Sequence, residues 1–184
     1  MLPRRREHVP PPARTLLAVE EHRETPDGPR LAFVHLDELP WTEVIAQEHG
    51  DRRVSVHEKF LEWTPQRMVV LGRYDPGMVI ERHGHASDNL VYVLEGDLDV
   101  GGRPCPAGTL IILEQGAVFG PLTAGPDGCL LFETWGSDVT PVPADKEGYA
   151  KLLAERGITR LPNPPFERPA SAPPSDLGTG DRWS

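Results

Sequence analysis

The chain has 184 residues and a net charge of −9, and these values exclude several classes of protein. The acidic excess is confined to residues 31–158, which hold 20 Asp and Glu against ten Lys and Arg. A domain this acidic repels a phosphate backbone, so we do not expect a nucleic-acid partner. No apolar run approaches the roughly 18 residues that a membrane-spanning helix needs, so we do not expect membrane insertion.

Proline marks both ends of the chain. Ten of the 21 prolines lie in residues 1–12 and 162–174, which lack apolar periodicity. Such segments bury too little surface to offset the entropy lost on ordering. We therefore predict a disordered Pro/Arg-rich tail over residues 1–14 and a disordered Pro-rich tail over residues 161–184.

The charged N-terminal residues and the two cysteines indicate in which cellular compartment we expect the protein. Arg4–Arg6 resemble the charged start of a secretion signal, but prolines 10–12 stand where its apolar region belongs. Cys105 and Cys129 form no disulfide framework and no Cys-x-x-Cys pair. We expect a cytoplasmic protein whose two thiols are reduced and structural.

The first predicted elements form an N-terminal extension over residues 15–52. Residues 16–20 and 31–36 flank Thr25–Pro29, a turn sequence that predicts a hairpin. Residues Trp41–His49, which follow Pro40, are interpreted as a short helix.

Short strands then follow one another about every ten residues. They are rich in Val, Ile, Leu and aromatics, and Gly, Pro and Asp separate them. The pattern predicts an antiparallel sandwich or small barrel. The expected strands are 54–61, 68–74, 78–83, 89–95, 98–101, 109–113, 117–119 and 129–135. A C-terminal helix is predicted within residues 141–160, with Asp145 as its cap and Gly157 at its end.

The main candidate functional residues lie in the stretch from Gly77 to Gly96. All seven histidines lie at or before His85, and His83 and His85 form a His-x-His pair. Residues two apart on a strand share a face, so the two imidazoles can converge on one ion. Neutral imidazole suits Zn, Fe, Ni or Cu.

This stretch resembles the first motif of the cupin superfamily, G-x5-H-x-H-x3–4-E-x6-G. Gly77, His83, His85 and Gly96 match it, and Asn89 stands at the glutamate position. The second motif resembles residues 101–119, where the family's third ligand histidine falls on Phe119. The resemblance implies an all-β jelly-roll barrel over residues 53–140, often dimeric, with a ligand pocket in its mouth.

A usual cupin site holds a divalent ion with three histidines and one carboxylate. Here the resemblance implies His83, His85 and Asn89 as metal ligands, an incomplete set. His57 and Glu133 are candidate additional ligands, because Glu133 is a charged residue inside an apolar strand and needs a partner. Four further residues are candidates for the wall of the ligand pocket because of their side-chain chemistry or their position in the motif: Arg73, Tyr92, Phe119 and Trp135.

Three functions follow. The first is a metal-dependent enzyme on a small organic molecule, a dioxygenase or an isomerase/lyase that uses Fe, Mn, Ni or Zn. The second is a non-catalytic small-molecule binding or sensor module without metal. The third is a metal-free enzyme in which His83 or His85 acts as general base. For all three we expect a homodimer and a small-molecule ligand.

Overall fold

The computed structural model describes residues 19–173, and the chain divides into two compact units, Met1–Glu38 and Leu39–Ser184. The predicted tail over residues 1–14, and residues 174–184 of the other predicted tail, lie outside the described part. Within residues 19–173, no helix is long and apolar enough to cross a membrane.

The first unit contains the predicted hairpin. Strand β1 (Val19–Arg23) pairs antiparallel with β2 (Arg30–Val34), and a short 3-10 helix η1 (Leu36–Glu38) follows. In the turn between the strands, the Gly28 amide donates a 3.0 Å hydrogen bond to the Thr25 carbonyl oxygen. The turn chemistry of Thr25–Pro29 therefore forms the connection that the sequence predicts.

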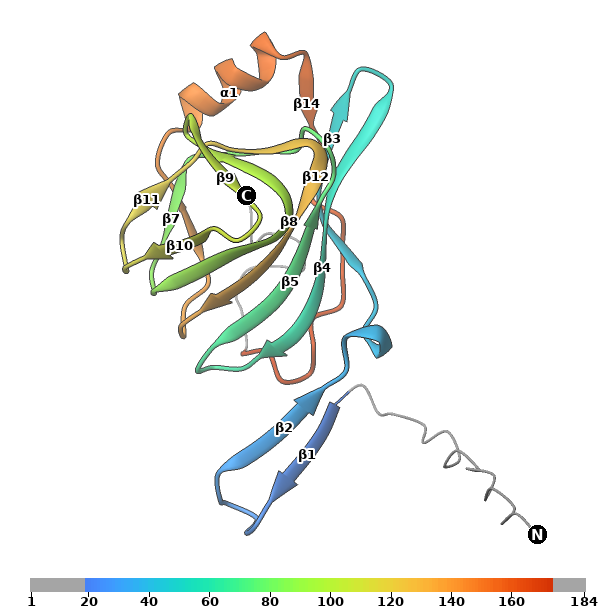
Figure 1. Cartoon of the computed structure of the whole chain (residues 1–184), viewed down its shortest axis with the longest axis vertical. Helices are drawn as coiled ribbons and strands as arrows, with labels where there is room; N and C mark the ends of the chain where they lie inside the picture. Colours follow the sequence, from blue (N-terminus) through green and yellow to red (C-terminus); the bar gives the residue numbers. More distant parts are fainter. Residues whose placement is uncertain (1–18, 174–184) are drawn as a thin grey trace, which may run out of the picture. The chain divides into compact units, whose positions relative to one another are not determined.

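The second unit is an antiparallel barrel of two sheets (Figure 1). In the larger sheet the strand order is β10-β8-β12-β5-β4-β3-β14, with β6 paired to β12 and β9 paired to β8; the smaller sheet has the order β11-β7-β13. This architecture confirms the predicted all-β jelly roll. The strands are β3 (Thr42–His49), β4 (Arg52–Trp63), β5 (Met68–Tyr74), β6 (Val79–Ile80), β7 (His83–His85), β8 (Asn89–Val100), β9 (Arg103–Pro106), β10 (Leu110–Leu113), β11 (Val118–Phe119), β12 (Leu122–Trp135), β13 (Pro141–Pro143) and β14 (Ile158–Arg160).

The helix predicted over residues 41–49 is wrong, because this segment is strand β3. It pairs with β4 on one side and β14 on the other, with Ile45 opposite Val56 and His49 opposite Ile158. All of Val44–Gln47 are buried, with Val44 and Ile45 in the main core cluster and the Gln47 side chain bonded to the Val79 carbonyl oxygen. The barrel therefore begins at β3, before the predicted boundary at residue 53.

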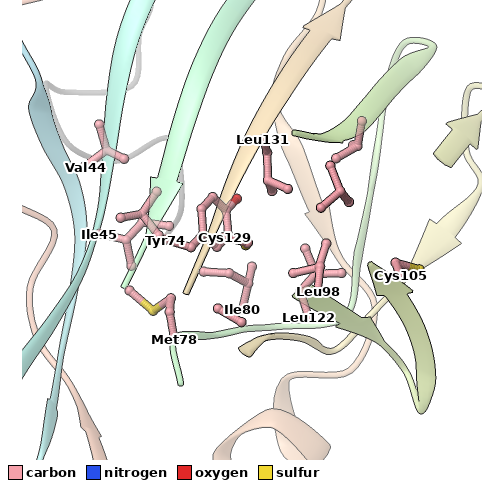
Figure 2. Close-up of a cluster of buried hydrophobic side chains, with 14 of the residues drawn as sticks. Val44, Ile45, Tyr74, Met78, Ile80, Leu98, Cys105, Leu122, Cys129 and Leu131 are labelled. Carbon is pink, nitrogen blue, oxygen red and sulfur yellow. The ribbon is translucent and has the colours of Figure 1, made fainter. Parts of the chain in front are cut away.

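The core fills the barrel with inward-facing side chains from facing strands (Figure 2). Along β4, Val54 and Val56 are fully buried, and each such side chain stabilises the fold by about 1.5–3 kcal/mol. Cys105 and Cys129 belong to this core and are free thiols. Burial raises the pKa of the Cys129 thiol to about 12, so it stays protonated and inert. This agrees with the predicted structural role.

The opposite side of β10, β8 and β12 carries exposed apolar side chains. Cross-strand pairing places Leu110 beside Tyr92, Tyr92 beside Phe132, and Ile112 beside Leu90. We call this surface the outer apolar face; its exposed members are Leu90, Tyr92, Leu94, Leu110, Ile112 and Phe132. Large apolar patches on proteins commonly mark contact sites.

Helix α1 (Lys146–Glu155) forms where the sequence predicts a helix. The Asp145 side chain caps its first turn by accepting a hydrogen bond from the Gly148 amide. Tyr149 fastens the helix to the barrel, since its hydroxyl donates a 3.1 Å hydrogen bond to the Val79 carbonyl oxygen. Leu153 packs on Val79 and completes the attachment.

The chain after β14 packs against the barrel, whereas composition predicts a disordered tail there. We call residues 161–173 the C-terminal strap; it runs along the barrel to the ends of β4 and β5 (Figure 1). The Leu161 amide donates a 3.0 Å hydrogen bond to the Ala46 carbonyl oxygen. Phe166 then packs against both main core clusters. Arg168 and Ala172 contact the same end of the barrel, so composition alone underestimates how far this segment is packed.

Candidate functional site

The site is built on β7, the central strand of the smaller sheet. His83 and His85 are buried, with exposed fractions of 2% and 4%. Their ring centroids lie 5.0 Å apart and the ring planes are 89° apart. The two imidazoles therefore lie side by side, as their spacing on a strand predicts.

Two motif glycines have backbone conformations that explain their positions. Gly77 (φ 78°) forms the turn before β6, and Gly96 (φ 71°) lies at the irregular pairing of β8 with β12. A Cβ atom at Gly96 would collide with the Gly128 carbonyl oxygen. Glycine tolerates both the left-handed backbone and this close approach, so these positions serve the barrel and not the chemistry directly.

The protonation state of His83 follows from its surroundings. Its Nδ1 atom lies 2.8 Å from the Glu81 carbonyl oxygen, which can only accept, so Nδ1 carries the proton and donates. Burial lowers the pKa of His83, and this outweighs the opposing effect of the hydrogen bond. The ring is therefore neutral at pH 7, with its lone pair on Nε2.

Asn89 is fully buried at the start of β8. Its side-chain nitrogen donates a 3.1 Å hydrogen bond to the Thr134 carbonyl oxygen. Its Oδ1 atom is buried and has no hydrogen-bond partner among the described residues. A buried acceptor without a partner costs about 1–3 kcal/mol, so this oxygen is suited to a donor supplied from outside the chain.

Phe119 occupies the place where the resemblance locates a third histidine. It pairs with His83 in the register between β11 and β7, and the two ring centroids lie 4.8 Å apart. The His85 ring lies 6.4 Å from the same phenyl ring. An apolar ring thus covers one side of both imidazoles.

Trp135 lies between the histidines and the end of the barrel. Its ring is 5.7 Å from that of His85, and its backbone pairs with Asn89. Cross-strand pairing continues from Trp135 to Met68 and from Met68 to Trp63, so these residues form one row across four strands. We call this row, Trp63–Met68–Trp135–Asn89, the mouth row.

Glu133 faces the barrel interior but bonds to a tyrosine. The Tyr74 hydroxyl donates a 3.5 Å hydrogen bond to its Oε1 atom. Gly72 makes room for this contact, because a Cβ there would lie 3.3 Å from the Tyr74 ring and 3.4 Å from Oε1. Sequence reasoning missed a second interior acid, Glu58, which is 1% exposed. Alternation along the strand would have found it, since Glu58 shares a face with Val56.

Three predicted site residues lie on the outer side of the larger sheet, opposite the barrel interior. His57 stands between two inward-facing neighbours and pairs with Arg73 across the strands. Arg73 is exposed, and its guanidinium lies 4.5 Å from the Trp41 ring centroid. Tyr92 belongs to the outer apolar face. We therefore correct the assignment of Arg73 and Tyr92 to the pocket and of His57 to the ligand set: strand alternation places all three outside.

The donor set does not fit the metal centre that the cupin resemblance implies. Imidazole binds metal ions as an uncharged ligand and an amide oxygen carries no charge, so the set supplies no anionic ligand, and an amide oxygen is a weaker ligand than a carboxylate for a divalent ion. Within residues 19–173, no group of three or more His, Cys, Asp or Glu side chains could hold a metal ion. Phe119 fills the remaining side. The arrangement is a buried cluster in which aromatic rings lie against two imidazoles and an amide with hydrogen-bonding capacity.

An antiparallel barrel that carries an inward His-x-His strand between motif glycines defines the cupin class. Residues 29–137, more than half of the chain, match the model of the ChrR cupin-like domain family. The chain belongs to this family.

Of three similar solved structures, the first shows the same fold. The polyketide cyclase RemF from Streptomyces resistomycificus is 16% identical over 67% of this chain and 94% of its own, with a TM-score of 0.52. An RmlC-like cupin from Shewanella frigidimarina is 19% identical over 70% of this chain and 97% of its own (TM-score 0.45). A chain of the complex of SigE with the anti-sigma ChrR from Rhodobacter sphaeroides is 19% identical over 55% of this chain and 51% of its own (TM-score 0.42). The search of curated proteins found no match.

Proposed function

We propose that the protein binds a small organic molecule in the barrel at His83, His85 and Asn89, by hydrogen bonding and ring packing without a tightly held metal. The observation that carries the proposal is the buried Asn89 Oδ1 atom, which has no hydrogen-bond partner among the described residues. A ligand N–H or O–H group that donates to this oxygen removes the cost of leaving it unpaired.

The chemistry of the walls narrows the class of ligand. Phe119 and Trp135 place aromatic surfaces against the two imidazoles. The neutral His83 ring and the neutral amide of Asn89 give the site no fixed charge of their own. A planar, uncharged molecule with one donor group suits these walls better than a phosphate or a polycarboxylate.

The test compares phenol with anisole, which differ by a hydrogen-bond donor. Ligand-observed NMR titrations of the wild-type chain measure both dissociation constants. We expect phenol to bind about fivefold tighter, a typical gain for one buried hydrogen bond. Asn89→Leu, which keeps the approximate shape and removes the acceptor, abolishes this preference. Leu90→Ala changes the next residue on the outer apolar face and is the matched control. Equal binding of the two molecules, or a preference that survives in Asn89→Leu, overturns the proposal.

The metal-dependent dioxygenase or isomerase/lyase is the alternative function, and elemental analysis of protein purified without a His-tag tests it. One equivalent of Fe, Mn, Ni or Zn per chain supports that alternative. The homodimer and the cytoplasmic location stay predictions. The outer apolar face supports the first of them, and the two buried, free cysteines are consistent with the second.

A further inference from the structure

The end of the barrel nearest His85 is covered by the chain itself. Phe166 of the C-terminal strap packs against the cluster of Trp63, Met68, Val70 and Trp135. Three of these, all except Val70, belong to the mouth row with Asn89, and Trp135 also contacts the ring of His85. The strap therefore lies over the same end of the barrel as the proposed binding site.

The contact is an aromatic stack. The Phe166 and Phe60 ring centroids lie 5.4 Å apart with planes at 18°, and Phe60 stacks in turn on Trp63 at 5.3 Å and 29°. Both distances are in the range that favours aromatic pairs. The place that Phe166 occupies is thus shaped for a planar ring.

The strap is attached mainly through side chains. Arg168 lies with its guanidinium 4.5 Å from the Trp63 ring centroid, and its Nη2 donates a 2.7 Å hydrogen bond to the Pro173 carbonyl oxygen. Proline has no backbone N–H, so the strap cannot add to the sheet as a regular strand. The prolines of the strap are Pro162, Pro164, Pro165, Pro169 and Pro173. The strap is bonded to the barrel backbone at Leu161, and beyond it the side chains of Phe166, Arg168 and Ala172 contact the barrel. Since it lies outside the sheets, its far end can open locally while the barrel stays folded.

We infer that the recess under Phe166 is an aromatic subsite of the barrel, and that the strap occupies it in competition with a ring of the ligand. This inference rests on the proposed function, because it extends the same site beyond His85 and Asn89. Ligand entry and strap release are then one exchange: a ring of the ligand replaces Phe166 on Phe60 and Trp63. The apparent affinity for the ligand is then the intrinsic affinity multiplied by the fraction of time that the strap is open.

The experiment uses the full chain and 2-naphthol, whose two fused rings carry one hydroxyl donor. Fluorescence titration compares wild type with Phe166→Ala, Arg168→Ala and Phe33→Ala. We expect Phe166→Ala to bind 2-naphthol about tenfold tighter, which corresponds to a strap closed about nine-tenths of the time. Arg168→Ala, which loosens the strap and keeps the ring, gives a smaller gain. Phe33→Ala removes an exposed phenyl ring from β2 and binds like wild type.

A peptide supplies the second readout. A synthetic peptide of residues 161–173 is expected to displace 2-naphthol from the Phe166→Ala protein, whereas the same peptide with alanine at position 166 does not. Near-UV circular dichroism and the melting temperature of each variant show that the barrel is folded. Affinities within twofold for wild type, Phe166→Ala and Arg168→Ala, or equal displacement by the two peptides, overturn the inference.

The two proposals fail in different ways. If the strap variants bind alike while Asn89→Leu still abolishes the preference for phenol over anisole, the strap inference alone is wrong. If Phe166→Ala binds 2-naphthol more tightly while phenol and anisole bind equally, the aromatic subsite stands and the hydrogen-bonding role of Asn89 is wrong.

Discussion

Under the proposed function, restoring the two missing ligands should create a metal site of higher affinity than the native residues provide. The double variant Asn89→Glu with Phe119→His supplies one carboxylate and one imidazole. Position 119 pairs with His83, and its ring lies 4.8 Å from that histidine, so a histidine there reaches the same space. Loss of groups that merely orient ligands costs about 10–100-fold in metal affinity. Gaining two direct ligands should therefore tighten Zn²⁺ binding by at least about a thousandfold, or roughly 4 kcal/mol.

The apo double variant should also be less stable than wild type. Position 89 is fully buried, and an uncompensated buried charge costs about 3–5 kcal/mol. We therefore expect its melting temperature to fall without metal and to recover with Zn²⁺, while Zn²⁺ leaves wild type unchanged. Differential scanning fluorimetry and a chelator competition titration measure both effects, and Phe119→His alone should be intermediate. Wild type that binds Zn²⁺ stoichiometrically below micromolar concentration, or a double variant without gain, would refute the reasoning.

Two further perturbations test the fold around the site. Gly72→Ala should cost about 1–3 kcal/mol in urea unfolding, because the new methyl group presses on Tyr74 and on the Glu133 carboxylate; an unchanged midpoint would mean that both side chains move away freely. Ile112→Glu, at a side chain 68% exposed on the outer apolar face, should convert a dimer to monomer in size-exclusion chromatography with light scattering. A dimer that survives uses another surface, and a monomeric wild type contradicts the predicted homodimer.

Local signals in the sequence predicted most strands and helix α1. The strand over residues 68–74 and the Asp145 cap occur where the pattern places them, because turn residues and alternation are local properties. Strand β3 was missed since its burial depends on partners on both sides, 52–58 and 158–160, which are distant in sequence. A strand buried on both faces loses the alternation that would identify it.

The sequence predicted that His83 and His85 lie together, but not what surrounds them. His83, His85 and Phe119 come together because the motif spacing fixes one strand and its neighbour. Arg73 and Tyr92 were misplaced because a strand in sequence does not show which of its faces is inside until its partners are known. Phe166 could not be assigned to the site from the sequence, because it is a single aromatic residue in a proline-rich segment. Its partners, Phe60 and Trp63, lie about a hundred residues earlier in the chain.

The two walls of the proposed site differ in how the backbone holds them. The histidine strand β7 has paired strands on both sides, with Phe119 opposite His83 and Val142 opposite Gly84. The strap has proline at five of its 13 positions and lies outside the sheets. Amide hydrogens of β7 should therefore exchange slowly with solvent, while those of the strap exchange quickly through local opening. In the proposed site, β7 would then be a fixed wall that carries the polar groups, and the strap an adjustable wall that sets the size of the ligand.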